Sequence, residues 1–279
     1  MQSLAGLARW VLPFLMGLTI WPSAVAELVF SAPPRESQQV GEEIYAPLTD
    51  YLADLLGQPV VYQHPYNWLA YQRDMRAGRY DLVFDGPHLV AWRIAHIDHQ
   101  PLVRLPSPLK FHVITLAQRE DINELDDLIG KRLCAFAPPD FGTLLVTGDF
   151  LNPIQQPALT EIGDGGFEAV WGAFTGRACD AAIVRTSFFY TELSQQDRSL
   201  TRVIYTTYEH PNQALTAGPR VTDEQRRKIT LSLTTNPTGI AATAALRAHY
   251  DKHAPRLVVA QANEYAGHNF LLEGVVFGW

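Results

Sequence analysis

Short apolar runs and stretches of helical periodicity alternate along the first third of the chain. Residues 28–30, 60–62 and 82–84 are apolar runs with the length and composition of buried strands. Between them, residues 42–56 and 68–77 repeat apolar side chains at the spacing of one helix face, and a glycine follows each stretch. This βαβαβ order predicts an α/β lobe with parallel strands.

The second half of the chain repeats the first in pattern and in residue type. Phe-Ala-Pro-Pro-Asp at 136–140 echoes Phe-Ser-Ala-Pro-Pro at 30–34, and Gly-Arg-Ala-Cys-Asp at 176–180 echoes Gly-Arg-Tyr-Asp at 78–81. Such self-similarity indicates duplicated units. Two similar lobes would face a common cleft, because α/β sheets bind ligands beyond the carboxyl ends of their strands. The second copy predicts strands at 131–136, 159–162 and 179–185 and helices at 143–150 and 167–175.

The chain is expected to cross between the lobes twice. Phe111–Leu116 alternates apolar and polar residues and is interpreted as the first crossing strand, and residues 213–217 resemble its partner on the way back. Helices are expected at 223–234, after a Thr-x-x-Gln capping box, and at 239–250. The lobe that carries the helix at 223–234 stays open. The expected division is a signal peptide at 1–26, a discontinuous first lobe at 27–112 plus 217–279, and a second lobe at 113–216 that includes the hinge strands.

Residues 1–26 have the features of a cleaved secretory signal. Arg9 precedes an apolar stretch at 10–21, and Ala24-Val25-Ala26 fits the small-x-small pattern that signal peptidase reads. An uncleaved membrane anchor is the alternative, but the run is shorter than the roughly 20 apolar residues that span a bilayer. We therefore expect a soluble protein exported to the periplasm.

The composition restricts the class of partner. Hydrophobic residues make up 47% of the chain and charged residues 18%, which is typical of a globular protein. The formal net charge is −7 and becomes −8 when Arg9 is lost with the signal. Nucleic acid is an improbable partner for so acidic a chain. We expect a monomer that binds a small molecule.

Two cysteines occur, both in the second predicted lobe. Cys134 lies within the strand expected at 131–136, and Cys179 begins the strand that ends at Arg185. Adjacent parallel strands lie about 4.8 Å apart, which is within reach of a disulfide. Because disulfides persist in exported proteins, we expect a bridge, with two buried thiols as the alternative.

Several segments resemble one family, the phosphate, phosphite and phosphonate solute-binding proteins of ABC importers. The segments that carry this resemblance are Ala-Pro-Leu-Thr-Asp-Tyr-Leu at 46–52, Tyr-Asp-Leu-Val-Phe-Asp-Gly-Pro at 80–87, Gly-Lys-Arg at 130–132 and Cys-Asp-Ala-Ala at 179–182. The resemblance covers nearly all of the mature chain. It implies the two-lobed fold of type II periplasmic binding proteins, with two similar sheet-and-helix lobes joined by a two-stranded hinge, and a binding function without catalysis.

The chain departs from the family pattern at two places. Pro139 to Thr143 replace the Ser-Thr-Ser-Gly-like loop of phosphonate binders, and Arg185-Thr186-Ser187 stand where an acidic residue is often found. The resemblance therefore implies a site in the same place with altered chemistry.

Four helix N-termini are expected to converge on the cleft, and each would favour an anion through its free N–H groups. The expected ligand-binding residues lie at these termini or at the loop after the second strand, and they are Arg35, Tyr66, Trp68, His88, Asp140, Gly142, Thr143, Arg185, Thr186 and Ser187. Helix capping is the alternative for the hydroxyl residues, a surface or capping role is the alternative for His88, and core packing is the alternative for Tyr66 and Trp68. Asp140 would repel a dianion, so a zwitterionic or amine-bearing ligand stays open.

Enzyme motifs are weak in this chain. Ser107-Pro-Leu-Lys110 matches the Ser-x-x-Lys pattern but lies in a proline-rich passage without a following Lys-Thr-Gly. His96 with His99, and His249 with His253, lack a third metal ligand, so solvated positions are the better interpretation. We expect no catalysis, no metal and no cofactor.

Two functional hypotheses follow from these observations. The first is a periplasmic receptor that closes on a small polar, anionic solute such as a phosphonate or phosphate and delivers it to an ABC permease in the inner membrane. The second is a sensor of the same fold whose closed form contacts a membrane-bound kinase. An exported enzyme is a weaker third possibility.

Overall fold

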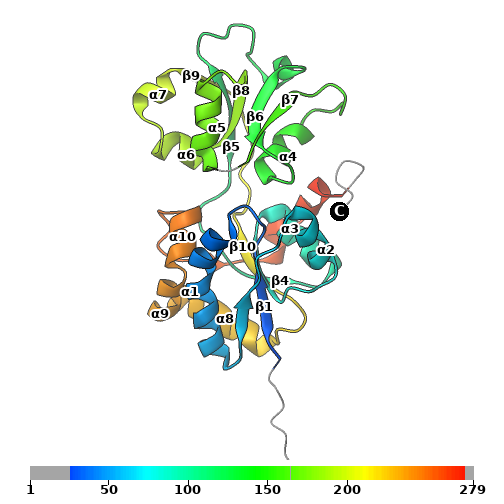
Figure 1. The fold of residues 1–279 in the computed structure, drawn as a ribbon, viewed down its shortest axis with the longest axis vertical. Helices are drawn as coiled ribbons and strands as arrows, with labels where there is room; N and C mark the ends of the chain where they lie inside the picture. Colours follow the sequence, from blue (N-terminus) through cyan, green and yellow to red (C-terminus); the bar gives the residue numbers. More distant parts are fainter. Residues whose placement is uncertain (1–25, 164, 274–279) are drawn as a thin grey trace, which may run out of the picture.

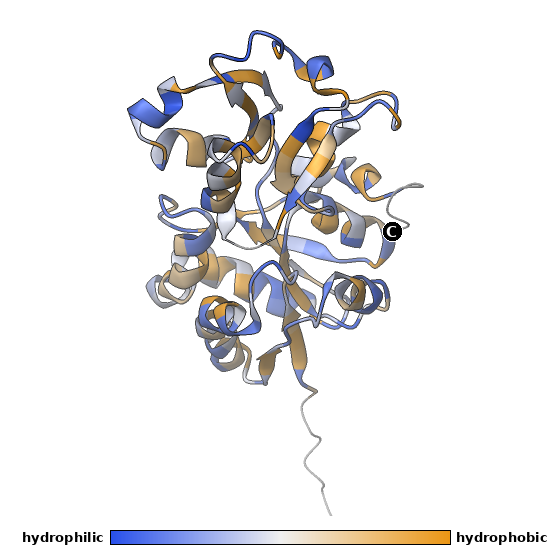
Figure 2. Cartoon of the chain, turned by 45° about the horizontal axis from the view of Figure 1, so that its top comes forward, coloured by the Kyte–Doolittle hydropathy of each residue, from blue (hydrophilic) through white to orange (hydrophobic). Residues whose placement is uncertain are grey.

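A computed structural model describes residues 26–163 and 165–273, and it contains two α/β lobes, one above the other in Figure 1. The predicted signal peptide lies almost wholly outside the described residues. Many strand residues are hydrophobic, and many helices have both hydrophobic and hydrophilic residues (Figure 2). In the described part of the chain, no helix has the length and apolar character needed to cross a membrane.

The first lobe is defined by a six-stranded sheet with the order β11-β4-β10-β3-β1-β2. β1, β2 and β3 are parallel, and β10 runs antiparallel to both β3 and β4. Its elements are β1 (Leu28–Ser31), α1 (Gln38–Leu56), β2 (Val60–Tyr62), α2 (Trp68–Arg76), β3 (Leu82–Asp85), α3 (Pro87–His96), β4 (Gln100–Arg104), β10 (Ala214–Ala217), α8 (Asp223–Thr235), α9 (Pro237–Ala242), α10 (Ala244–Tyr250), β11 (Val258–Val259), η2 (Ala262–Tyr265) and η3 (His268–Leu271).

The central strands β3 and β10 of this lobe are buried on both faces. Leu82 and Phe84 of β3 pack on one side with residues of α1, α8 and α10, whereas Val83 packs on the other with residues of α2 and α3. This division follows from the alternation of side chains along a strand. The helix α8, whose lobe the sequence left open, packs against β4, β11 and α1 of the first lobe.

The second lobe is defined by a five-stranded sheet with the order β7-β6-β8-β5-β9. β6 is parallel to β7 and β8, and β5 is antiparallel to β8 and β9. Its elements are β5 (Phe111–Leu116), η1 (Leu125–Leu128), β6 (Arg132–Phe136), α4 (Phe141–Gly148), β7 (Ala158–Ile162), α5 (Gly166–Thr175), β8 (Ala181–Arg185), α6 (Thr186–Thr191), α7 (Gln195–Ser199) and β9 (Thr201–Thr206).

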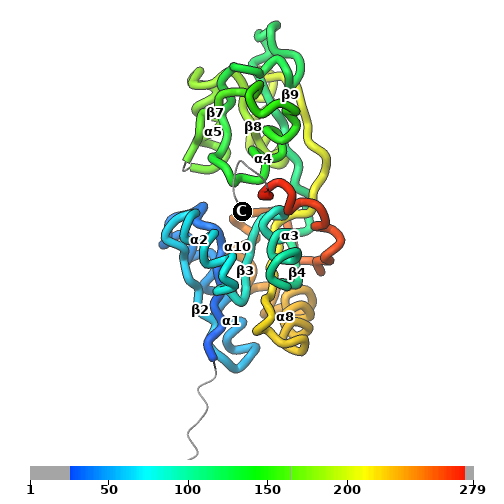
Figure 3. Tube along the Cα trace, turned by 90° about the vertical axis from the view of Figure 1, so that its right-hand side faces the viewer, coloured from blue at the N-terminus to red at the C-terminus, as the bar shows by residue number. Residues whose placement is uncertain are grey.

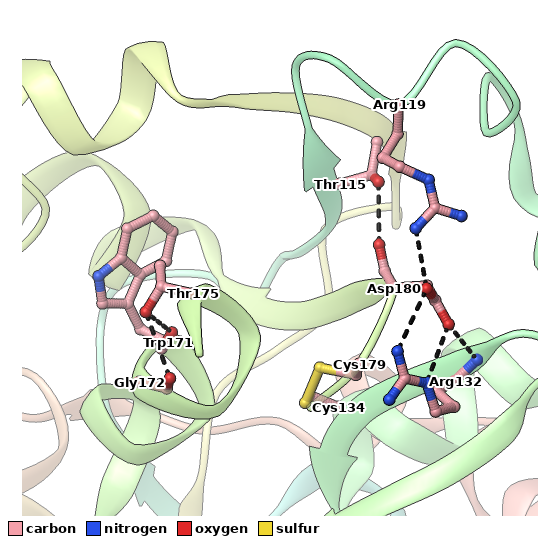
Figure 4. Close-up of a disulfide and its surroundings, with 9 residues drawn as sticks. All are labelled: Thr115, Arg119, Arg132, Cys134, Trp171, Gly172, Thr175, Cys179 and Asp180. Carbon is pink, nitrogen blue, oxygen red and sulfur yellow. Dashed lines mark hydrogen bonds and ion pairs between the residues drawn. A yellow bond between two sulfur atoms is a disulfide. The ribbon is translucent and has the colours of Figure 1, made fainter. Parts of the chain in front are cut away.

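The repeated Gly-Arg and Asp pattern has the same structural role in both lobes. The Asp81 carboxylate accepts the Val29 backbone N–H at 2.7 Å, and the Asp180 carboxylate accepts the Arg132 backbone N–H at 3.0 Å. Each aspartate thereby joins the strand that it precedes to the parallel strand beside it, which is β1 in the first lobe and β6 in the second. Asp180 also accepts hydrogen bonds from the Arg119 and Arg132 guanidinium groups (Figure 4).

Cys134 and Cys179 form a disulfide whose Cα atoms lie 5.6 Å apart (Figure 4). Cys134 lies in β6, and Cys179 lies just before the neighbouring strand β8. Both side chains belong to the apolar cluster on the α5 side of the sheet. The bond therefore links β6 to the segment that enters β8.

The chain crosses between the lobes twice, but the crossing residues differ from those expected. β5 lies wholly in the second sheet and β10 wholly in the first, so these two strands do not pair with each other. The connections are residues 105–110 and 207–213, which run side by side and meet in an antiparallel bridge between Leu109 and His210. The expected pairing of Phe111–Leu116 with 213–217 is wrong, because each strand lies inside its own sheet and pairs there on both sides.

Two other local expectations differ from the structure. The proline-rich passage after α3 contains β4, with Pro101 beside an irregularity in the register of β10. Strand proline is tolerated at such irregular positions. The helix expected at 239–250 is divided into α9 and α10, with Thr243 between them.

The C-terminal segment lies across the level where the lobes meet (Figure 3). η2 and η3 pack against α3 of the first lobe, while Leu271 also packs against the core of the second lobe. His268 Nε2 lies 3.0 Å from His210 Nδ1, and its ring centroid lies 5.9 Å from that of Phe141. This segment therefore contacts both lobes without being one of the two covalent connections.

Candidate functional site

Segments that precede four helices meet where the lobes face each other. Arg35 before α1 and His88 in the first turn of α3 come from the first lobe, and Asp140 before α4 and Arg185 before α6 come from the second. The charges of Arg35, Asp140 and Arg185 interact with one another. His88 Nε2 donates to the Pro139 carbonyl at 2.8 Å across the boundary. The structure therefore brings four of the expected site residues together.

Arg35 is held by a carboxylate and an aromatic ring of its own lobe. Its Nη2 donates to Asp85 Oδ1 at 3.3 Å, and its guanidinium carbon lies 5.8 Å from the centroid of the Trp68 ring. Burial lowers the pKa of Arg35, but Asp85, Tyr250 and further acidic groups outweigh it and raise that pKa above its usual value. Arg35 is therefore a fixed cation, with its side chain 21% exposed.

Asp85 is the buried anchor beneath Arg35. Its Oδ1 also accepts the Gly86 N–H at 2.6 Å. Its Oδ2 accepts Nη1 of Arg93 at 3.0 Å and the Tyr71 hydroxyl. The side chains of Asp85 and Arg93 are both fully buried. A carboxylate with this many donors is held in one orientation.

His88 is fully buried at the boundary between the lobes. Its ring stacks on Phe141 of the second lobe at a centroid distance of 5.2 Å. Because Nε2 donates to a carbonyl, the neutral ring carries its proton there, and Nδ1 is buried without a partner among the described residues. Burial lowers the pKa of His88 to about 4, Arg35 and His268 add to this shift, and Asp85 opposes it.

Acidification is expected to open the molecule through His88. The closed form, with a pKa of about 4, binds fewer protons than an open form with an ordinary imidazole pKa near 6.5. Closure is then weakened as the pH falls from about 6.5 to 4, by at most about 1.4 kcal/mol per pH unit.

The radius of gyration from X-ray scattering should rise over this window. His88→Gln should flatten the response, and an unchanged response would contradict the assignment. Burial raises the pKa of Asp140, which acts in the opposite sense, so the comparison of variants is needed.

Asp140, Gly142 and Thr143 have local roles in α4. The Asp140 carboxylate caps the helix by accepting the Thr143 N–H at 3.0 Å. Thr143 is fully buried and donates its hydroxyl to the Phe136 carbonyl at 2.8 Å. A Cβ at Gly142 would lie 2.7 Å from the ring of Phe111. Capping therefore accounts for Thr143, and packing accounts for Gly142.

Arg185 is the second arginine at the boundary. Its Nη1 donates to the Tyr250 carbonyl of the first lobe at 3.1 Å, and the guanidinium carbon lies 5.6 Å from the centroid of the Phe167 ring. Its Nε is buried without a partner among the described residues. Burial lowers the pKa of Arg185, and Asp140 opposes that shift. Arg185 is therefore a cation whose hydrogen-bonding capacity is incompletely used.

Three expected residues lie apart from this cluster. Tyr66 is 92% exposed, so it does not pack against the residues of the boundary. Thr186 donates its hydroxyl to the Lys110 carbonyl at 3.1 Å. Thr186 and Ser187 line an open cavity of about 570 Å³ beside the crossing segments, together with Lys110 and Tyr190. The structure does not bring these three side chains to Arg35.

The sequence did not point to two groups that complete the cluster. The Tyr250 hydroxyl donates to Glu36 Oε1 at 2.9 Å and lies 2.7 Å from the Tyr45 hydroxyl. Hydrogen bonds from His249 and Tyr250, with the charge of Arg35, keep the pKa of Glu36 below its usual value although burial raises it. Position 250 is remote in the sequence from position 36, so only the folded chain reveals this contact.

The helix N-termini differ in what they offer an anion. Ser37 and Asp140 cap α1 and α4 through side-chain hydrogen bonds. α3 begins at Gly86 and Pro87 without a side-chain cap. α6 also begins without a side-chain cap, but the N–H of its first residue, Thr186, donates to the Lys110 carbonyl at 2.9 Å. The first turn of α3, beside Arg35 and His88, is therefore the terminus best able to receive an anionic group. No group of three or more His, Cys, Asp or Glu side chains in the described part of the chain could hold a metal ion.

Solved structures share this fold. The chain is 18% identical to the PhnD1 protein of Prochlorococcus marinus in complex with methylphosphonate, with a TM-score of 0.65 over 88% of this chain and 97% of that one. It is 15% identical to a binding protein component of an ABC phosphonate transporter from Pseudomonas aeruginosa, with a TM-score of 0.63 over 88% and 85%. A Xanthomonas citri protein bound to ATP gives a TM-score of 0.70 at 11% identity, over 88% and 96%.

The sequence itself matches one family model. The model describes the periplasmic substrate-binding protein of the phosphonate ABC transporter, and it matches residues 30–256. A search of curated proteins finds no match. The fold is that of type II periplasmic binding proteins, and the family is one of binding proteins rather than enzymes. The chain belongs to the phosphonate ABC transporter substrate-binding protein family.

Proposed function

We propose that this protein closes its two lobes on a small anion of the phosphonate or phosphate class and delivers it to an ABC permease in the inner membrane. The observation that carries the proposal is the placement of Arg35 and Arg185 on opposite lobes, with their charges close enough to interact. Two like charges at a boundary repel each other, and an anion between them removes that repulsion. Family membership supports the same role.

Closure about the two connections would complete the site. Arg35, His88 and the uncapped first turn of α3 form the first-lobe half, and Arg185 and Asp140 form the second-lobe half. A planar guanidinium group suits the oxygen atoms of a phosphonate, since it presents paired donors. Closing contacts that do not involve the ligand include the ion pair between Lys252 and Glu192. The ligand would add its own bonds to both halves and shift the population toward the closed form.

Asp140 restricts the ligand further. Its carboxylate lies near both arginines, so a ligand with an ammonium group beside its anionic group would satisfy all three side chains. A simple phosphonate would instead place its charge near Asp140. Binding should therefore be measured for methylphosphonate, inorganic phosphate and an aminophosphonate, using calorimetry. The function proposed here fails if the protein binds none of these compounds.

Removal of Arg185 should weaken binding of the anion. Loss of a charge-assisted hydrogen bond costs about 1.5–3 kcal/mol, which is roughly 10-fold to 150-fold in affinity. Calorimetry on Arg185→Ala measures this effect. Arg227→Ala on the exposed side of α8 is the matched control and should bind as the natural protein does. Equal affinities for the two variants would remove Arg185 from the site.

The proposed setting of the protein is the periplasm. The features of residues 1–26 support export by a cleaved signal, and mature protein beginning at Glu27 would be the expected product. Mass spectrometry of the exported chain measures that start directly. A monomer that meets its permease in the closed form is the assembly that we propose.

A further inference from the structure

Arg93 is the largest fully buried side chain in the described part of the protein, and its charge lies directly behind the candidate site. It comes from α3. Its Nη1 lies 3.0 Å from Asp85 Oδ2 and 3.0 Å from the Tyr71 hydroxyl, and its Nε donates to Thr216 at 3.2 Å. Burying a guanidinium group costs free energy unless it is paired. The charged partner of Arg93 is Asp85, which is also the carboxylate that pairs with Arg35.

Asp85 divides its two oxygen atoms between two arginines. Oδ2 faces Arg93 and Tyr71, and Oδ1 faces Arg35 and the Gly86 N–H. The contact to Arg35, at 3.3 Å, is longer than the contact to Arg93, at 3.0 Å. One negative charge is therefore shared by two positive charges, and the group of three retains one net positive charge.

The consequence concerns the charge that faces the other lobe. Asp85 and Arg35 alone would form a neutral pair, and the remaining carboxylates of Asp140 and Glu36 would then outnumber Arg185. With Arg93 included, this set of side chains has three guanidinium groups and three carboxylates before a ligand arrives. Arg93 is fully buried, so it cannot contact the ligand, and its nearest charged group is Asp85, which also binds Arg35.

We propose that Arg93 is a positioning residue for the anion site: it neutralises Asp85 from behind, so that Asp85 orients Arg35 without cancelling its charge. This inference rests on the proposed function, because it assigns Arg35 to an anionic ligand. It differs from a purely structural role for Arg93 in one respect. The loss of ligand affinity caused by a substitution at Arg93 must depend on the presence of Arg35.

The test is a set of variants titrated with methylphosphonate and inorganic phosphate by calorimetry. Arg93→Met should lower the affinity by about tenfold, since a buried unit charge lies within several ångströms of Arg35. Arg93→Lys should restore the affinity to within about threefold of the natural protein, because the charge is kept. In an Arg35→Ala background, Arg93→Met should change the affinity by less than about twofold, because the group through which it acts is gone.

Two results would overturn the inference: natural affinity in Arg93→Met, or an equal loss in the presence and absence of Arg35. If Arg93→Met does not fold, the double variant Asp85→Asn with Arg93→Met replaces it, because no buried charge is then left unpaired. Arg35 keeps its charge in that variant but loses the carboxylate that orients it, so the affinity should fall by less than in Arg35→Ala. A loss as large as that of Arg35→Ala would also overturn the inference.

Failure of the proposed function has a different signature. The natural protein would then bind neither probe, or Arg35→Ala would bind both as well as the natural protein does. In those cases the anion site is misplaced and Arg93 has nothing to position. A loss of binding in Arg35→Ala together with natural affinity in Arg93→Met would instead reject only the role of Arg93.

Discussion

Replacement of both Cys134 and Cys179 by alanine should lower the free energy of unfolding by about 4 kcal/mol. The two residues are 45 positions apart, and a bridge across a loop of this size removes considerable entropy from the unfolded chain. For a protein of this size the thermal midpoint should fall by about 8–16 °C. Chemical and thermal denaturation followed by circular dichroism measure both quantities.

A reductant provides the control for this experiment. Dithiothreitol should destabilise the natural protein by a similar amount and should leave the double-alanine variant unchanged. Loss of stability in the variant with no effect of reductant on the natural protein would mean that packing of the two side chains matters and the bond does not. The ligand affinity should be little altered, because the disulfide lies on the α5 side of the second sheet.

Asp85→Ala should lower the free energy of unfolding by about 3–5 kcal/mol, because it leaves the charge of Arg93 buried and unpaired. The side chains of both residues are fully buried, so water cannot replace the lost partner. Urea denaturation measures the change. Asp223→Ala is the matched control, because it removes an exposed aspartate paired with Arg226, and it should cost no more than about 1 kcal/mol.

The double variant Asp85→Ala with Arg93→Met separates charge from packing. It removes both buried charges, so most of the stability lost in Asp85→Ala should return. If the double variant is as unstable as Asp85→Ala, the loss comes from the cavity and the hydrogen bonds of Tyr71 and Gly86, and the pairing with Arg93 is not the cause.

The larger features of the fold could be predicted from local patterns. The strands of both lobes are short apolar runs, and periodic stretches between them indicate α1, α2 and α5. The repeated aspartate was informative for a physical reason, since Asp81 and Asp180 make the same hydrogen bond to the neighbouring parallel strand, β1 in the first lobe and β6 in the second. β4 escaped prediction because Pro101 and the prolines after it resemble a loop, whereas an irregular register accommodates the proline.

The candidate site was predictable only in part. Arg35, His88, Asp140 and Arg185 could be found because each lies between the end of a strand and the first turn of the next helix, and the carboxyl ends of strands in two facing lobes meet at one boundary. Tyr66, Thr186 and Ser187 fit the same rule but lie elsewhere, because the rule gives the end of the sheet and not the direction of a side chain. The backbone N–H and the hydroxyl of Thr143 are already used in hydrogen bonds to Asp140 and to the Phe136 carbonyl.

Other members of the cluster depend on tertiary contacts. Asp85 lies in the segment 80–87, whose glycine and proline indicate a turn before a helix. Its role as the common partner of Arg35 and Arg93 is seen only in the folded chain. Glu36 and Tyr250 are brought together from opposite ends of the chain. No local pattern encodes such a pair, because the contact depends on how α10 packs beside α1.

The order in which the strands of the first lobe are synthesised has a consequence for assembly. β10 lies between β3 and β4, yet it follows the entire second lobe in the sequence. A growing or translocating chain therefore presents the edge of β3 without its neighbour until residue 214 has emerged, while residues 111–206 already hold every strand of the second sheet. The intermediate with that open edge is the form most exposed to aggregation, and the late arrival of β10 ends the exposure.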